Sequence, residues 1–172
     1  MKHKIFFVCF LLSPISFSQQ TITLNPAADA YVDESQPAMN YGSQNLLFAG
    51  PQGSTGSNMD LQFFIRFDLS AYAGRTITTA TLRLYKQRTS SVVLKASVLT
   101  TSWTESTVTW NTSPFDAGVF GNFTTSTNPV TLDVTQQVKD WLSGSVSNYG
   151  FQVRSDFNQG SLNDYYGFYS RE

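Results

Sequence analysis

Two short runs of alternating residues carry side chains that could together bind an acidic sugar. Arg83 and Tyr85 alternate with leucines in the first run, and Lys95 alternates with apolar residues in the second. Successive side chains of a strand point to opposite faces, so a hairpin over Leu82–Leu99 places these three on one exposed face, with Arg88 near the turn. Guanidinium groups match sugar carboxylates in bidentate geometry, and a tyrosine ring is a flat surface for a sugar ring. The pattern leaves two interpretations open, a binding cluster and a solvated face whose cations maintain solubility.

Two tryptophans bracket an acidic residue in the segment from Trp103 to Pro114. Trp103 and Trp110 are an odd number of residues apart, so in an unbroken strand their rings point to opposite faces. One ring could then fill the core while the other is exposed as a platform for a sugar. The alternative, which we favour, places both rings in the core, with Glu105 accepting hydrogen bonds from loop amides.

Oxygen-bearing side chains occur at two places that suit a structural calcium ion. Asp156 and Asn158 stand at alternate positions before Gly160, as at the start of a calcium loop, but the bidentate glutamate of such a loop is missing. A turn rich in Asn, Asp and Gly is the simpler interpretation. Asp29 and Asp33 could instead hold calcium at the rim of the fold. No cofactor is predicted beyond this possible structural calcium.

The first 18 residues have the pattern of a secretory signal peptide. The basic head Lys2–Lys4 precedes the mostly apolar run Ile5–Ile15, and Ser16–Ser18 has the small-x-small pattern of a cleavage site. The apolar run is too short to span a membrane, so no membrane insertion is expected. We therefore expect a secreted or cell-surface protein that begins near Gln19, with a signal peptide over 1–18 and one domain over 19–172.

Cleavage there removes the only histidine and the only cysteine. The remaining chain has no disulfide, no imidazole base and no Cys/His zinc site. It loses two of 11 basic residues and keeps all 12 acidic ones, so its net charge is negative and does not suit nucleic acid. A catalytic base would have to be a carboxylate, a lysine or a tyrosine. A glycosidase pair of Glu105 with an aspartate, or a tyrosine/arginine lyase site, has no supporting spacing, so we predict a non-catalytic protein.

Short runs of β-branched and aromatic residues, separated by Gly, Asn and Ser, predict many short strands. The fold class that follows is all-β, an antiparallel β-sandwich. The segment Gly50–Asn58 is predicted as a loop from its glycines and serines. The predicted strands are Thr21–Leu24, Ala30–Asp33, Asn45–Ala49, Leu61–Leu69, Ile77–Tyr85, Val92–Leu99, Val130–Val134, Gly150–Arg154 and Tyr165–Tyr169.

One short helix is predicted near residues 134–143. Val138 and Trp141 share a face at helical spacing, and Asp133 or Thr135 offers an N-terminal cap. Gly144 supplies the C-terminal stop, because glycine readily adopts the left-handed conformation there. A helix of this length would close one end of the sandwich.

Seven motifs resemble the DNRLRE-type domain, also classed as carbohydrate-binding module family 96. They occur in the family's order along nearly the whole chain after residue 18, and each alone is weak. The motifs are Ala28–Val32, Asn40–Gly42, Phe64–Ser70, Thr76–Tyr85, Trp103–Pro114, Leu132–Thr135 and Asn148–Phe151.

The resemblance implies a jelly-roll-like β-sandwich that binds an acidic polysaccharide such as alginate, often as an accessory to a lyase or hydrolase. The family usually continues into a last strand of Pro-x-Leu-x-Val type, whereas this sequence ends at Glu172. We therefore expect a fragment of a longer protein, fused to further domains. The function predicted is a secreted, non-catalytic carbohydrate-binding module. The alternative is a structural spacer or adhesive module of a cell-surface protein.

Overall fold

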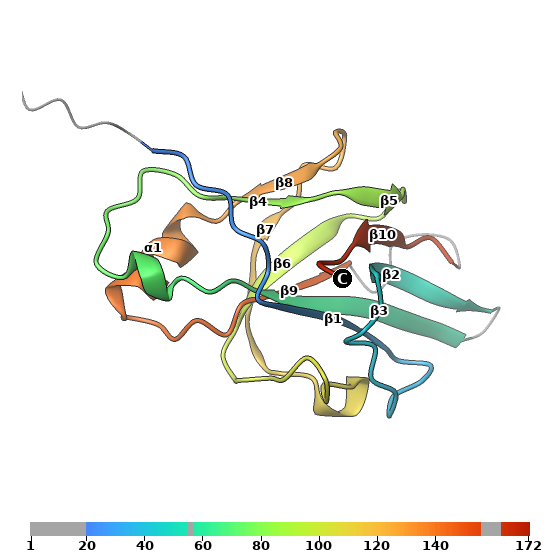
Figure 1. The fold of residues 1–172 in the computed structure, drawn as a ribbon. Coiled ribbons are helices and arrows are strands. Elements are labelled where there is room, and N and C mark those ends of the chain that lie inside the picture. Colours follow the sequence, from blue (N-terminus) through green and yellow to red (C-terminus); the bar gives the residue numbers. More distant parts are fainter. Residues whose placement is uncertain (1–19, 55–56, 156–162) are drawn as a thin grey trace, which may run out of the picture.

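The computed structural model describes residues 20–54, 57–155 and 163–172, and it confirms an all-β fold with one short helix (Figure 1). The predicted signal peptide and the calcium candidates Asp156 and Asn158 lie outside the described residues. The strands are β1 (Ala28–Asp33), β2 (Leu46–Ser54), β3 (Ser57–Arg66), β4 (Thr81–Leu84), β5 (Lys86–Arg88), β6 (Leu94–Leu99), β7 (Asp116–Asn122), β8 (Val130–Asp133), β9 (Phe151–Ser155) and β10 (Tyr166–Tyr169). The helices are the 3-10 turns η1 (Ser70–Tyr72) and η2 (Trp110–Thr112) and the α-helix α1 (Thr135–Ser143).

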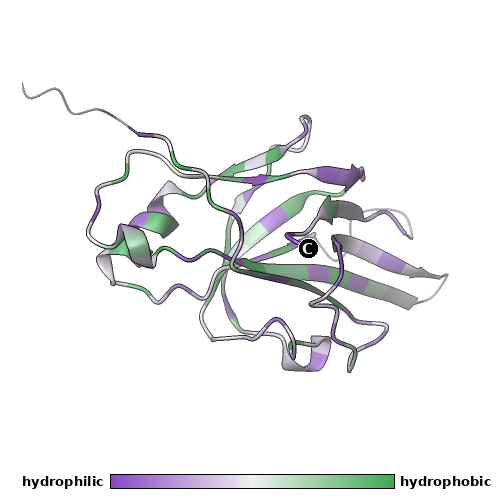
Figure 2. Cartoon of the chain, in the orientation of Figure 1, coloured by the Kyte–Doolittle hydropathy of each residue, from purple (hydrophilic) through white to green (hydrophobic). Residues whose placement is uncertain are grey.

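The larger sheet is antiparallel and runs in the order β1–β3–β9–β6–β7. Its side chains alternate between two sides, as the period of a strand requires. In β3, Phe63 and Ile65 belong to the main core, whereas Phe64 belongs to a second buried cluster on the opposite side. Figure 2 shows both hydrophobic and hydrophilic residues along β3, and the three consecutive residues Phe63, Phe64 and Ile65 are all hydrophobic. Both sides of this sheet therefore carry buried residues.

The smaller sheet lies across the main core from the larger one. Strand β4 pairs with β8, and β5, which follows β4 after Tyr85, pairs with β10, which in turn pairs with β2. Leu47 and Phe168 from this layer pack in one buried cluster with Phe63 and Val153 from the larger sheet. The described residues thus form a two-layer sandwich whose core lies between the sheets.

Strand β2 joins the two layers by changing sheet at Gly50. Its first half, Leu46–Ala49, pairs with β10, and its second half, from Gly50 to Ser54, pairs with β3. Gly50 has a φ of 135°, and a Cβ there would lie 2.7 Å from the Cα of Tyr165. Only glycine suits both the backbone angle and this close approach. The sequence between residues 50 and 58 is therefore a corner followed by a hairpin, and the prediction of a loop over Gly50–Asn58 was wrong.

The segment of residues 100–115 covers the outer side of the larger sheet. Trp103 and Val108 from this segment pack with Ala30, Phe64 and Leu99 in the second buried cluster. In Figure 1 the segment runs below β1 and β3. This packing buries apolar side chains on the side of β3 that a simple two-layer sandwich would expose.

The predicted hairpin over Leu82–Leu99 was wrong. Strand β4 pairs with β8, with Leu82 opposite Leu132, whereas β6 pairs with β7 and β9 in the other sheet. The alternation itself was right, because Leu82, Leu84, Leu94 and Ala96 are all buried in the main core. Alternation fixes which side of a strand is apolar but leaves the identity of the neighbouring strand open.

Other strand predictions differ from the structure at the weakest patterns. Residues 21–24 are not a strand, and the short strands β5 and β7 were not predicted. Each of these segments carries few buried apolar side chains, so it gives little period-2 signal. The helix was predicted within one residue. It starts at Thr135, whose amide donates to Asp133 Oδ1 at 2.8 Å, and ends at Ser143, where Gly144 with a φ of 75° forms the C-terminal cap.

Candidate functional site

The outer side of the smaller sheet carries a group of aromatic and cationic side chains. We call it the tyrosine face and define it by Arg83, Tyr85, Arg88, Phe48, Tyr165 and Tyr169. The neighbours of these residues along their strands, Leu47, Leu84 and Phe168, point into the main core. Strand alternation therefore directs the tyrosine face away from the core.

Tyr85 and Tyr169 are the most exposed rings of the tyrosine face. Their side chains are 56% and 61% exposed, and the two residues are neighbours across adjacent strands, because Tyr169 N donates to Tyr85 O at 3.1 Å. Arg83 lies two residues before Tyr85 on the same strand side and is also exposed. An exposed pair of rings next to a guanidinium group offers both a stacking surface and a partner for a carboxylate.

A β-bulge brings Arg88 onto the tyrosine face. Phe168 is opposite Lys86 and Gly167 is opposite Arg88, so Gln87 has no partner of its own in the pairing of β10 with β5. Without the extra residue, strand alternation would turn Arg88 towards the core. Lys86, on the other side of the bulge, donates from Nζ to Thr125 O at 2.9 Å. The bulge thus adds a second arginine to the face.

Gly167 lies in the middle of the tyrosine face, and its lack of a side chain leaves room for the neighbouring side chains. A Cβ at Gly167 would lie 3.2 Å from Arg88 Cβ and 3.3 Å from Phe48 Cε1. The guanidinium of Arg88 lies over the Tyr165 ring, 3.9 Å from its centroid, and Phe48 meets the same ring edge-on at 5.6 Å. Arg88 Nη2 also donates to Asn163 O at 2.7 Å. These contacts hold one end of the face in a fixed arrangement.

Two more tyrosines extend the ring contacts towards β1. Tyr31 meets Phe48 edge-on at 5.1 Å and stacks on Tyr41 at 4.3 Å with 17° between the planes. Burial, together with the nearby Tyr41 and Asp33, raises the pKa of Tyr31 to about 12, so its hydroxyl stays protonated at neutral pH. A continuous line of rings therefore leads from the edge of β1 to Arg88.

Lys95 does not join the tyrosine face, so the prediction that it does so was wrong. It lies on the outer side of the larger sheet, opposite Arg154 of β9 and Asn122 of β7. Its neighbours on that side form a second group, which we call the polar face. The polar face consists of Asp60, Gln62, Lys95, Ser97, Gln152 and Arg154.

The two tryptophans that were candidates for sugar binding pack within the fold. Trp103 is 7% exposed, its ring packs on Phe64 at 5.7 Å, and its Nε1 donates to Tyr149 O at 2.8 Å. The Arg66 guanidinium lies over the same ring, 5.6 Å from its centroid. Trp110 is half-buried against the same cluster. Trp103 is therefore part of the core and offers no free ring face to a sugar.

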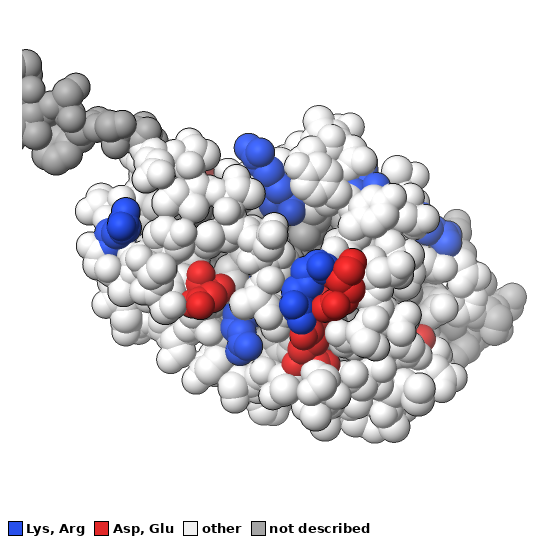
Figure 3. All heavy atoms as spheres, in the orientation of Figure 1, with Lys and Arg blue, Asp and Glu red and all other residues white. Residues whose placement is uncertain are grey.

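Glu105 forms an ion pair with Arg171, near the end of the sequence. Its carboxylate accepts two hydrogen bonds from the Arg171 guanidinium and one from Asp29 N, the latter at 2.8 Å. Burial opposes its ionisation, but the bonds from Arg171 and Asp29 outweigh this and lower its pKa. Figure 3 shows basic and acidic side chains gathered where the chain ends, on a surface that is otherwise mostly uncharged in this view. These contacts give Glu105 a structural role.

The carboxylates of the calcium candidates Asp29 and Asp33 have different hydrogen-bond partners. Asp29 Oδ2 accepts a hydrogen bond from Arg171 N, and Asp33 Oδ1 accepts two from Ser35. Burial raises the pKa of Asp29 to about 6. Within the described ranges 20–54, 57–155 and 163–172, no three His, Cys, Asp or Glu side chains gather as they would around a metal ion.

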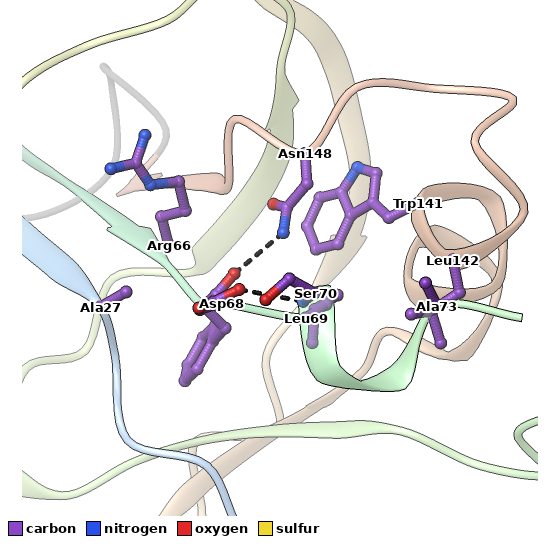
Figure 4. A pocket seen from close by; sticks show the side chains of 10 residues that line it. Ala27, Arg66, Asp68, Leu69, Ser70, Ala73, Trp141, Leu142 and Asn148 are labelled. Atoms are coloured by element: carbon purple, nitrogen blue, oxygen red, sulfur yellow. Dashed lines mark hydrogen bonds between the residues drawn. The ribbon is translucent and has the colours of Figure 1, made fainter. Parts of the chain in front are cut away.

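A surface hollow of about 520 Å³ lies between η1 and α1, lined by residues that include Arg66, Asp68, Ser70, Trp141 and Asn148 (Figure 4). Two of its polar side chains, Asp68 and Asn148, already have hydrogen-bond partners within the chain. Ser70 N donates to Asp68 Oδ1, and Asn148 Nδ2 donates to Phe67 O, both at 2.9 Å. The hollow is therefore a poorer candidate for a polar ligand than the tyrosine face.

Asp60, on the polar face, makes the stability of the fold depend on pH. Burial and the nearby Glu34 raise its pKa to about 7, although Leu61 N and Arg154 oppose this. In the unfolded chain the carboxyl ionises near its ordinary value of 3.8. The folded state therefore binds more protons between about pH 4 and pH 7, and its stability falls as the pH rises through that window.

Asp60→Asn is expected to flatten this dependence and to raise the free energy of unfolding at pH 8 by up to about 4 kcal/mol. Urea denaturation at pH 4, 6 and 8 measures the effect. Asp68→Asn is the matched control, because Asp68 is exposed and a hydrogen bond from Ser70 N lowers its pKa. Equal loss of stability on raising the pH in wild type and Asp60→Asn would contradict the assignment.

Comparison with known proteins defines the class of this sandwich. The family model of carbohydrate-binding module family 96 matches residues 20–172. The chain therefore belongs to carbohydrate-binding module family 96, as the sequence motifs predicted. A search of curated proteins found no match.

The family assignment supports carbohydrate binding by a β-sandwich, and such families are typically non-catalytic. Among the helices of the described residues, none has the length and apolar character needed to cross a membrane.

The sequence patterns identified part of the tyrosine face. Arg83, Tyr85 and Arg88 were predicted as ligand-binding residues and lie there together. Phe48, Tyr165 and Tyr169 were missed, although a period-2 signal for two of them exists. Tyr165 and Tyr169 stand at odd positions of a correctly predicted strand, while Tyr166 and Phe168 fill the core.

Proposed function

We propose that this chain is a secreted, non-catalytic module that binds an acidic polysaccharide such as alginate through the tyrosine face. The observation that carries the proposal is the exposed pair Tyr85 and Tyr169 beside the two arginines Arg83 and Arg88. Sugar rings stack on the exposed tyrosines, and the carboxylates of successive uronate residues meet the guanidinium groups. The family assignment supports the glycan as the ligand class.

The cations on this face support an acidic ligand. Arg83 and Arg88 are the two charged members of the tyrosine face, and the exposed carboxylate of Asp133 lies on the same sheet side, opposite Thr81. A neutral glycan would need stacking and hydroxyl contacts alone. A uronate polymer uses both kinds of side chain, and several spaced contacts add up along its repeat, since each exposed ion pair contributes only about 0–1 kcal/mol.

The proposal places the module outside the cell, as an accessory to a larger enzyme. The N-terminal pattern over residues 1–18 supports export, because it has the basic head, apolar run and small residues of a signal peptide. The intact mass of the exported protein is expected to lack these residues and hence Cys9. A mass that retains Cys9 would contradict cleavage.

Affinity electrophoresis tests the binding proposal. Residues 19–172 are expected to be retarded in gels that contain alginate, less so as salt is added, and not in gels that contain a neutral glucan. Arg83→Ala is expected to weaken the retardation several-fold. Lys139→Ala is the matched control, since it removes an exposed positive charge from α1 instead.

Two results would contradict the proposal. Retardation by neutral glucans alone would exclude an acidic ligand. Absence of retardation by every glycan tested would favour the alternative function, a structural spacer or adhesive module.

A further inference from the structure

The polar face combines burial with missing hydrogen-bond partners. Asp60, Gln62, Ser97 and Gln152 are 6%, 8%, 0% and 5% exposed, although they lie on the outer side of the larger sheet. Apolar side chains are the usual occupants of positions buried to this degree. Polar residues at four such positions are therefore unusual.

Among the described residues, four atoms on the polar face lack a hydrogen-bond partner: Asp60 Oδ1, Ser97 Oγ, Gln152 Oε1 and Arg154 Nε. Gln152 uses its other group, since Nε2 donates to Gln62 Oε1 at 2.7 Å. Buried polar atoms are nearly always hydrogen-bonded in native proteins, to the chain, to water or to a ligand. Four such atoms on one face of three adjacent strands indicate that a group beyond the described part of the chain completes their bonding.

The charges beside these atoms indicate which ligand fits. Lys95 and Arg154 are directly opposite each other on β6 and β9, and two residue pairs further on Ser97 is opposite Gln152. Both cationic side chains are half-buried and long, so rotation about their stems can uncover the atoms beneath. The two cations outnumber the Asp60 carboxyl of the same face. Next to a hydroxyl and an amide oxygen, they match a sugar that carries both a carboxylate and hydroxyl groups.

We propose that the polar face is a second binding site for an acidic polysaccharide. The carboxylate of a uronate residue lies beside Lys95 and Arg154, and its hydroxyl groups donate to Gln152 Oε1 and exchange hydrogen bonds with Ser97 Oγ. The choice of ligand rests on the proposed function of the tyrosine face, whereas the site itself rests on the unpartnered atoms. The two faces belong to opposite layers of the sandwich, so one molecule holds two polysaccharide chains and cross-links them.

Isothermal titration with a hexamer of mannuronate or guluronate, using residues 19–172, tests this proposal. Wild type is expected to bind two oligosaccharides per chain. The polar-face double variant Lys95→Ala, Gln152→Leu and the tyrosine-face double variant Tyr85→Ala, Tyr169→Ala are each expected to bind one. With long alginate, wild type is expected to form light-scattering networks, and each double variant is expected to lose them.

The outcomes separate the two proposals. One site in wild type that persists in the polar-face variant and disappears in the tyrosine-face variant overturns the second site alone. One site that disappears only in the polar-face variant overturns the tyrosine face as the ligand site. If Gln152→Leu raises the melting temperature while both sites remain, water completes the buried groups and the polar face is not a ligand site. Circular dichroism of each variant verifies that it folds.

Discussion

Trp103→Ala is expected to lower the free energy of unfolding by about 3–5 kcal/mol, the range for removing a large buried aromatic ring. The ring is 7% exposed, packs on Phe64 and lies under the Arg66 guanidinium. Its loss also leaves Tyr149 O without the hydrogen bond from Nε1. Together with Val108 it anchors the segment of residues 100–115, so the loss is expected to loosen that segment from the larger sheet.

Urea denaturation of Trp103→Ala and Trp110→Ala, side by side, measures this effect. Trp110→Ala is expected to cost less, because its ring is half-buried at the margin of the same cluster. Alginate affinity is expected to be unchanged in Trp110→Ala. A Trp103→Ala variant of normal stability with weakened glycan binding would show that this ring is a sugar platform.

The double variant Tyr85→Ala, Tyr169→Ala is expected to weaken alginate binding at the tyrosine face by about tenfold to a hundredfold. A stacking ring contributes roughly 0.5–1.5 kcal/mol, and 1.4 kcal/mol corresponds to a factor of ten in affinity. Both rings are more than half exposed, so the free energy of unfolding is expected to change by no more than about 0.5 kcal/mol.

Phe115→Ala is the control for this pair, because Phe115 is 76% exposed and precedes β7 on the larger sheet, away from the tyrosine face. It is expected to leave affinity and stability unchanged. Titration calorimetry measures the affinity, and urea denaturation measures the stability. Equal loss of affinity in Phe115→Ala and in the tyrosine variant would indicate nonspecific binding by exposed aromatic rings.

The sequence of a single strand indicates which of its sides is buried, but it does not indicate which strand it pairs with. Alternation correctly divided Leu82 and Leu84 from Arg83 and Tyr85, because the side of a strand that is buried is a local property. The partner of β4 is a non-local property. Strand β8, 46 or more residues later in the chain, pairs with β4, while the nearby β6 belongs to the other layer.

Two backbone irregularities also shape the candidate site without a clear signal in the sequence. The bulge at Gln87 turns Arg88 outwards, and the corner at Gly50 carries β2 from one sheet to the other. Each changes the side or the sheet to which later residues belong. Lys95 was predicted correctly as outward-facing, but on the wrong sheet, because β6 pairs with β7 and β9 instead of β4.

The central claim, that the tyrosine face binds an acidic glycan, is tested most directly by nuclear magnetic resonance. Uniformly 15N-labelled residues 19–172 are titrated with an alginate hexamer, and the shift of each backbone amide is followed. The largest shifts are expected at residues 83–88 and 165–169, including Tyr85, Arg88 and Gly167, and smaller shifts are expected in the double variant Tyr85→Ala, Tyr169→Ala. Shifts confined to the hollow between η1 and α1, or to the polar face, would contradict it.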